Sequence, residues 1–278
     1  MDILLAVFLG FLQGVTEWFP VSSSGHLVLA QTYLGAGTVS TQEWIFFDIA
    51  VHVASILVVL ILFRREILRL VRAFLSIFPL LVKGERTENI LRSDPYRFLS
   101  VLIVVGTVPA VIMGYAFRRW FEAMFEQPLV VAISLIFTGF VLIMTYGLSG
   151  KRIIKDMKFS DALYVGIMQG FAIIPGVSRS GATISTGIVL GIKKTTAAKF
   201  SFLLAVPVIF GALVMHLPDM PPFSESYVVP LLAGFVTSFI VGLITLKLLV
   251  SLIRKGKFYL FAAYCWVLGA VVLALEIL

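Results

Sequence analysis

One arginine lies among glycine and hydroxyl residues in the segment Pro175–Thr183, which reads P-G-V-S-R-S-G-A-T. Arg179 is the only Lys or Arg of the second half of the chain that lies far from the end of an apolar run. A buried cation is costly unless it meets an anion, whereas glycines let a ligand approach the backbone and a helix start offers free N–H groups. The segment therefore predicts a phosphate-binding cradle, made by Gly176, Ser178, Arg179, Ser180 and Thr183.

A second group of reactive side chains lies near the N-terminus, in the segment Q-G-V-T-E-W-F-P-V-S-S-S-G-H. It combines a carboxylate, an imidazole and hydroxyl groups, which are the groups that general acid–base and nucleophilic phosphoryl transfer use. We expect Glu17 to be the base or orienting group and either Ser23 or His26 to be the nucleophile. The sequence does not rank these two nucleophiles. Gln13 and Ser22 are predicted substrate contacts.

Each of these side chains also has a purely structural interpretation. Glu17 can pair with Arg179 as an ion bridge, although the desolvation of both charges favours a functional role. His26 can be a hydrogen-bonding group at a helix start, and Ser22 or Ser24 can cap that helix.

Asp48 and His52 are four residues apart, which places them on one face of a helix. They are predicted to form a supporting pair that orients the site. An intrahelical hydrogen bond explains the same spacing equally well.

The composition predicts an integral membrane protein. The chain is 60% hydrophobic and 13% charged over 278 residues, with a mean hydropathy of +1.05, which soluble domains do not reach. The net charge of +7 comes from basic residues in short loops between apolar runs, so we expect no nucleic-acid partner. The single cysteine, Cys265, excludes a disulfide framework. No cleavable signal peptide is expected.

The two halves of the chain match each other at a constant offset of 156 residues, without a gap. We interpret this match as an internal repeat, with one half at about 1–150 and the other at about 157–278 of a single membrane domain. The residues around the two predicted hairpins that have identical partners in the second half include Gly10, Gln13, Gly14, Val21, Ser22, Ser24, Gly25, Leu34 and Gly35.

Each half is predicted to hold a re-entrant helical hairpin followed by three membrane spans. The hairpin pieces, 1–19 with 22–34 and 159–174 with 180–190, are apolar but too short to cross a hydrocarbon core of about 30 Å. The six predicted spans are 43–63, 96–117, 126–148, 197–217, 227–252 and 258–278. The basic segment 64–97 is partly amphipathic and is expected to lie along the membrane interface. The fold class is therefore an all-α polytopic membrane protein.

Nineteen of the 22 Lys and Arg residues lie in or beside four loops that the spans place on one side, which the positive-inside rule makes cytoplasmic. The loops 36–42 and 218–226 have no Lys or Arg and are expected outside. With three spans per half, the two repeats run in opposite directions. The first hairpin then enters from outside, the second from the cytoplasm, and their tips meet near the midplane.

These motifs resemble those of the undecaprenyl-diphosphate phosphatases, also called bacitracin-resistance proteins, and the resemblance covers essentially the whole chain. In that family an acidic residue or Gln is followed four positions on by Glu and then by a Ser-rich turn ending in His. Here the matches are Gln13, Glu17, Ser22, Ser23 and His26, and the second motif matches Pro175–Thr183 in full. The family also tends to be acidic at the position of Asp48.

The resemblance implies hydrolysis of a polyprenyl diphosphate to the monophosphate, at a site open to the outer side of the plasma membrane. Such an enzyme recycles the lipid carrier of cell-wall glycan synthesis and gives bacitracin resistance. Gln13 and Glu17 are the expected ligands of Mg²⁺ or Ca²⁺ if the reaction uses a metal, and Gln13 lowers the negative charge there. No organic cofactor is expected, and a homodimer is compatible with the sequence.

Two other classes of protein share this architecture. Inverted repeats with broken helices at the midplane are typical of secondary transporters, and a lipid flippase would use both membrane faces. The combination of Glu17, His26 and serines opposite Arg179 favours the enzyme, because a binding site needs the cation but no adjacent base and nucleophile.

Overall fold

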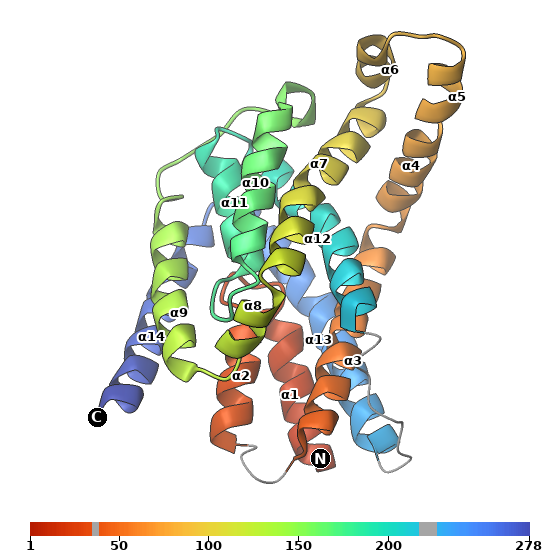
Figure 1. The fold of residues 1–278 in the computed structure, drawn as a ribbon. Coiled ribbons are helices and arrows are strands. Elements are labelled where there is room, and N and C mark those ends of the chain that lie inside the picture. Colours follow the sequence, from red (N-terminus) through yellow and green to blue (C-terminus); the bar gives the residue numbers. More distant parts are fainter. Residues whose placement is uncertain (35–38, 217–226) are drawn as a thin grey trace.

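The computed structural model describes residues 1–34, 39–216 and 227–278, and these residues form helices and loops without a β-strand (Figure 1). Among them, five helices are long and apolar enough to cross a membrane, or six if a bent pair is counted as one span. The five are α3 (Thr41–Leu62), α7 (Pro95–Ala116), α12 (Lys194–His216), α13 (Val228–Arg254) and α14 (Phe261–Ile277). The chain is therefore a polytopic membrane protein, as its composition predicted.

The bent pair falls on the predicted span 126–148. Here α8 (Arg118–Met124) turns by 98° into α9 (Pro128–Ile143), which has only 16 residues. Pro128 restricts the start of α9 because it occupies the first turn, and the turn after α9 includes Gly147 at φ 72°. The predicted span was thus too long at both ends, and a sixth crossing depends on the contribution of α8.

Two helical hairpins reach the middle of the molecule from opposite ends (Figure 1). The first consists of α1 (Ile3–Thr16) and α2 (Ser23–Leu34), and the second of α10 (Phe159–Phe171) and α11 (Arg179–Val189). Local capping explains two of the helix starts: the Asp2 carboxylate accepts from the Leu4 N–H at 3.3 Å, and the Ser178 hydroxyl accepts from the Gly181 N–H at 3.0 Å. The sequence predicted all four helices within a few residues.

Pairs of glycines let the first helix of each hairpin approach a long helix closely. A Cβ on Gly10 of α1 would collide with the carbonyl oxygen of Gly234 on α13, and a Cβ on Gly166 of α10 would collide with that of Gly106 on α7. Gly14 and Gly170, one turn further along, are equally crowded. Both helices thus use the small-residue spacing that permits close packing of membrane helices.

The two hairpin tips interlock. The Gly176 N–H donates to the Ser22 hydroxyl at 3.1 Å, and the Ser180 hydroxyl donates to the Trp18 carbonyl oxygen at 3.1 Å. A Cβ on Gly25 would lie 2.9 Å from the Gly176 Cα, so only glycine fits there. Ser22 has a φ of 68°, and such strain in a residue other than glycine is typical of functional sites.

The basic segment 64–97 is largely helical. It forms α4 (Arg64–Leu75), α5 (Ile77–Val82) and α6 (Thr87–Ser93), and α4 packs against α7 through a buried edge that includes Leu70 and Ala73. The segment extends the bundle at the end opposite the N-terminus (Figure 1). Leu70 and Ala73 are buried against protein, whereas other apolar residues of α4 are exposed. A position along the membrane interface stays a prediction.

Two short 3-10 helices, η1 (Ile154–Asp156) and η4 (Phe258–Leu260), precede the second hairpin and α14. The predicted outer loop 218–226 lies outside the described residues, as do residues 36–38 of the predicted outer loop 36–42.

The glycine contact between α1 and α13 can be tested by adding one methyl group. We expect Gly10→Ala to lower stability by about 1–3 kcal/mol, because the methyl would overlap the backbone of α13. The matched control is Gly211→Ala in α12, where a Cβ meets no heavy atom within 4 Å. Thermal unfolding in detergent, followed by circular dichroism, measures both. Equal midpoints for the two variants would contradict the packing described.

Candidate functional site

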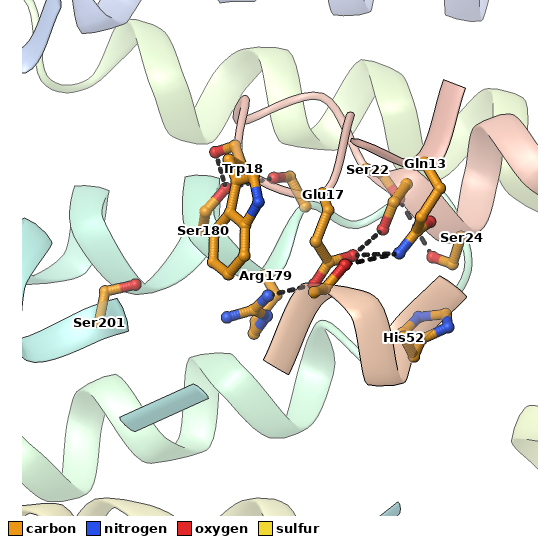
Figure 2. A network of polar contacts seen from close by, with 12 residues as sticks. Gln13, Glu17, Trp18, Ser22, Ser24, His52, Arg179, Ser180 and Ser201 are labelled. Atoms are coloured by element: carbon orange, nitrogen blue, oxygen red, sulfur yellow. Dashed lines mark hydrogen bonds and ion pairs between the residues drawn. The ribbon is translucent and has the colours of Figure 1, made fainter. Parts of the chain in front are cut away.

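The Glu17 carboxylate is the centre of the site, at the end of α1 (Figure 2). Its Oε1 accepts from Arg179 Nη2 at 2.5 Å, and its Oε2 accepts from Ser23 Oγ at 2.5 Å and from Gln13 Nε2 at 3.0 Å. Gln13 and Glu17 are buried, and they are neighbours because they lie one helical turn apart. The structure thus brings together four residues that the sequence predicted for the site.

The Arg179 guanidinium is only partly used by this ion pair. Its side chain is 14% exposed, and it lies over the Trp18 ring with the guanidinium carbon 5.9 Å from the centroid. Arg179 Nη1 is buried and has no hydrogen-bond partner among the described residues, and the same holds for Gln13 Oε1. Buried polar atoms are nearly always paired, so these two unpaired atoms are candidate contacts for a polar ligand.

The three serines of the first tip have different tasks. Ser22 Oγ accepts from the N–H groups of Gly25, at 3.2 Å, and Gly176, at 3.1 Å, and it also lies 3.2 Å from Ser24 Oγ. Ser22 thus holds the two tips together, and its predicted role as a substrate contact is not visible in its bonding. Ser23 is the serine whose hydroxyl reaches the carboxylate.

The second tip uses most of its hydroxyls within the protein. Ser178 Oγ caps α11, Ser180 Oγ bonds to the Trp18 carbonyl, and Thr183 Oγ1 donates to the Arg179 carbonyl at 2.7 Å. Thr183 Oγ1 also lies 2.6 Å from Ser201 Oγ. The hydroxyls of the predicted cradle therefore stabilise the turn around Arg179. Among the cradle residues, Arg179 has a buried donor, Nη1, without a partner in the described part of the chain.

His26 forms hydrogen bonds with other partners than Glu17 does. Its Nδ1 donates to the Ser22 carbonyl oxygen at 2.7 Å, so its Nε2 is left to accept from the Tyr264 hydroxyl at 2.7 Å. The His26 and Tyr264 rings are stacked, with centroids 5.7 Å apart. No hydrogen bond joins His26 to Glu17, Ser23 or Arg179 in the described part of the chain. Sequence reasoning missed Tyr264, because one tyrosine in an apolar helix carries no local signal.

Asp48 and His52 do not pair through their side chains. His52 Nδ1 donates to the backbone carbonyl of Asp48 at 2.7 Å, which is the intrahelical alternative. The Asp48 carboxylate instead accepts from Gln31 Nε2 at 2.9 and 3.2 Å, which ties α2 to α3. In the close-up, His52 and Gln13 lie on the same side of Glu17 (Figure 2), and Ser55, one turn further on, is 3.5 Å from Gln13 Nε2.

A metal ion would find few protein ligands at this site. No group of three or more His, Cys, Asp or Glu side chains with metal-ligand geometry occurs within residues 1–34, 39–216 and 227–278. The oxygens at hand are the unpaired Gln13 Oε1 and the Glu17 carboxylate. These suit Mg²⁺, which binds to one or two protein oxygens and completes its shell with phosphate oxygens and water.

Comparison with known proteins gives a consistent assignment. The family model described as bacitracin resistance protein BacA matches residues 6–271. A protein of Desulforapulum autotrophicum named undecaprenyl-diphosphatase is 37% identical over 272 residues, covering 98% of this chain and 97% of its own length. Proteins of the same name from Korarchaeum cryptofilum (99% of this chain, 100% of that protein) and Alkaliphilus metalliredigens (100% of both) are each 38% identical. The chain belongs to the BacA family of bacitracin-resistance proteins.

Proposed function

We propose that this chain is an integral membrane phosphatase that hydrolyses undecaprenyl diphosphate to the monophosphate and phosphate. The names of its full-length relatives support this proposal. The single observation that carries it is the position of Glu17, whose carboxylate contacts both a serine hydroxyl and an arginine from the other hairpin. A nucleophile, a base and a cation for the phosphate thus meet at one point.

In the proposed reaction, Ser23 Oγ attacks the terminal phosphorus and its proton passes to Glu17. The bond from that phosphorus to the bridging oxygen breaks, and undecaprenyl phosphate leaves with the proton that Glu17 returns to it. Water then attacks the phosphorus of the serine ester and gives a proton to Glu17. The bond from phosphorus to Ser23 Oγ breaks, Glu17 returns the proton to Ser23 Oγ, and inorganic phosphate leaves. Arg179 stabilises the developing charge through its free Nη1, because a preorganised guanidinium in a site of low dielectric interacts strongly with phosphate oxygens.

His26 has a positioning role in this scheme. Its Nδ1 bond to the Ser22 carbonyl supports the strained turn from which the Ser23 hydroxyl projects, and Tyr264 fixes the other side of the ring. When a Mg²⁺ or Ca²⁺ ion is bound, Gln13 and Glu17 would hold it and it would neutralise phosphate charge. We place the prenyl tail in the apolar surroundings of the helices, since only the headgroup must reach the two tips.

We further propose that the two halves form an inverted-topology repeat of six spans in the plasma membrane. The packing supports this: α1 packs on α13, whereas its counterpart α10 packs on α7, the counterpart of α13. The same exchange relates the contact of α3 with α13 to that of α12 with α7. Together with the basic residues at the opposite end, this orients the first hairpin outward, where the enzyme would recycle the lipid carrier and counter bacitracin.

Phosphate release separates an enzyme from a carrier. Purified protein in detergent, supplied with undecaprenyl diphosphate, is expected to release inorganic phosphate with multiple turnovers. Tight binding of the lipid without phosphate release, in protein whose thermal unfolding is cooperative, would favour a transporter or flippase instead.

Replacement of Arg179 by alanine or lysine should lower kcat/KM by at least about 100-fold. Lysine is not expected to rescue activity, because it cannot contact Glu17 and a phosphate oxygen with two nitrogens held in one plane. Phosphate release measures the effect, and near-normal turnover of the lysine variant would show that Arg179 is only a point charge.

Variants of Ser23 and His26 distinguish the two candidate nucleophiles, because the expected losses of activity differ. Ser23→Ala should lose at least about 1,000-fold in kcat, whereas Tyr264→Phe and His26→Gln should lose only about 10-fold, since they act through the turn. Rapid-quench assays with ³²P-labelled substrate should also trap a labelled protein in the wild type and not in Ser23→Ala. A labelled protein in Ser23→Ala that is lost in His26→Gln would reverse the assignment.

Sidedness can be tested in sealed proteoliposomes of known orientation. A membrane-impermeant maleimide should label Leu34→Cys, at the exposed end of α2, only from the outer side, and Lys155→Cys, at the opposite end of the molecule, only from the inner side. Phosphate should appear on the outer side. Inner labelling of Leu34→Cys would overturn the orientation, and phosphate released only inward would contradict the recycling role.

A further inference from the structure

The arginines of α4 play no part in the site described above. Arg65, Arg69, Arg72 and Ser76 follow each other at intervals of four, three and four residues, which places them on one face of the helix. Part of this face borders a cavity of about 390 Å³ between α4 and the start of α7. The cavity is lined by Arg69, Arg72, Ala73, Ser76, Asp94 and Tyr96.

The cavity carries positive charge that the protein does not neutralise. Neither Arg69 nor Arg72 forms an ion pair with a carboxylate among the described residues. Arg69 lies over the Tyr96 ring, with the guanidinium carbon 5.7 Å from the centroid. Asp94, the acidic residue of the lining, accepts from the Tyr96 N–H at 2.8 Å and so caps α7. Arg69 Nη1 also donates to the Tyr96 hydroxyl at 3.4 Å. The other guanidinium nitrogens of Arg69, and all those of Arg72, form no hydrogen bond among the described residues and are open to an external anion.

Further basic groups lie around the cavity, in addition to the carboxylates of Asp94 and Glu66. Arg97 is held at its edge by Ser76 Oγ, at 2.9 Å, and by Ser93 Oγ, at 2.8 Å. Lys199 lies over the Tyr96 ring at 5.9 Å, and its ammonium is 3.6 Å from the Glu66 carboxylate. Basic groups thus approach the cavity from α4, α7 and α12.

An exposed apolar stripe runs beside the basic face. Leu68, Val71 and Leu75 directly precede Arg69, Arg72 and Ser76, and they are 56%, 51% and 59% exposed. One residue corresponds to a rotation of about 100° around a helix, so the stripe borders the basic face on the side away from the buried edge. Phe78 of α5, 53% exposed, continues it. In a membrane protein such a stripe contacts acyl chains.

We propose that this cavity binds the phosphate headgroup of an anionic phospholipid whose acyl chains lie along Leu68, Val71 and Leu75. The guanidinium groups of Arg69 and Arg72 bind the phosphate oxygens, whereas the Ser76 hydroxyl already donates to the Ala73 carbonyl oxygen at 2.7 Å. A lipid fits better than free phosphate, because only a lipid uses the charged cavity and the apolar stripe together. The site lies at the opposite end of the molecule from the N-terminus and is separate from the Glu17 site (Figure 1).

Native mass spectrometry of the full chain in detergent tests this site. Titration with dioleoyl phosphatidylglycerol should show a bound lipid that dioleoyl phosphatidylcholine does not replace at equal concentration. The double change Arg69→Gln with Arg72→Gln should raise the apparent Kd for phosphatidylglycerol about 30-fold, equivalent to about 2 kcal/mol at about 1 kcal/mol per charge.

Arg92→Gln is the matched control. It removes one positive charge from the neighbouring α6, where Arg92 is exposed and paired with Glu88 at 2.9 Å, and it should leave the apparent Kd within about twofold. Arg72→Gln alone should raise the Kd about fivefold. The Arg72 side chain has no hydrogen-bond partner among the described residues, so this change is not expected to affect folding.

Three results would overturn the proposal. The first is an equal apparent Kd of the wild type for phosphatidylglycerol and phosphatidylcholine. The second is an apparent Kd of Arg72→Gln for phosphatidylglycerol that equals that of the wild type. The third is complete displacement of the lipid by millimolar inorganic phosphate, which would show a site for a free anion.

Discussion

The contact between Glu17 and Arg179 is the interaction on which the rest of the structure depends. It joins the two hairpins through residues that are 162 positions apart in the chain, and it places a negative and a positive charge inside the molecule, on side chains that are 5% and 14% exposed. Removal of one partner of a buried pair typically costs about 3–5 kcal/mol, because the other charge is left without compensation. Uncharged residues around the pair hold the two hairpins in position. Glycines let the helices pack closely, and the Ser22 hydroxyl accepts a hydrogen bond from the Gly176 N–H of the other tip.

The same pair explains why the site is incomplete without a ligand. Arg179 gives one nitrogen to Glu17 and keeps the other unpaired, and Gln13 gives its amide nitrogen and keeps its oxygen unpaired. A diphosphate headgroup would supply partners for both atoms: its oxygens would accept from Arg179 Nη1 and would bind any cation held by Gln13 Oε1. The protein thus positions the charges before the substrate arrives, and little reorganisation is needed during the reaction.

Much of this arrangement was predictable from the sequence, because it follows from periodicity and from the repeat. Helix bounds near Pro20 and Pro175 were correct since hydrophobic runs too short to span a bilayer must fold back, and Glu17, Ser23 and Arg179 were recognised by the rarity of such residues in apolar segments. Partners that meet only in three dimensions were not predictable. Tyr264 and Gln31 sit on helices whose apolar pattern gives no sign of a polar contact, and Asp48 bonds to Gln31 although His52 is its neighbour on the helix. The length of α9 also depends on the bend at Pro128, which composition alone does not show.

The most direct test is a crystal or cryo-EM structure of the full chain with undecaprenyl methylenebisphosphonate, in which carbon replaces the bridging oxygen that must leave. The account predicts that the terminal phosphonate lies within hydrogen-bond distance of Arg179 Nη1, with Ser23 Oγ opposite the methylene carbon and still bonded to Glu17. A headgroup bound elsewhere, with the Glu17–Arg179 pair intact and Arg179 Nη1 still unpaired, would contradict the proposal that the two tips form the catalytic site.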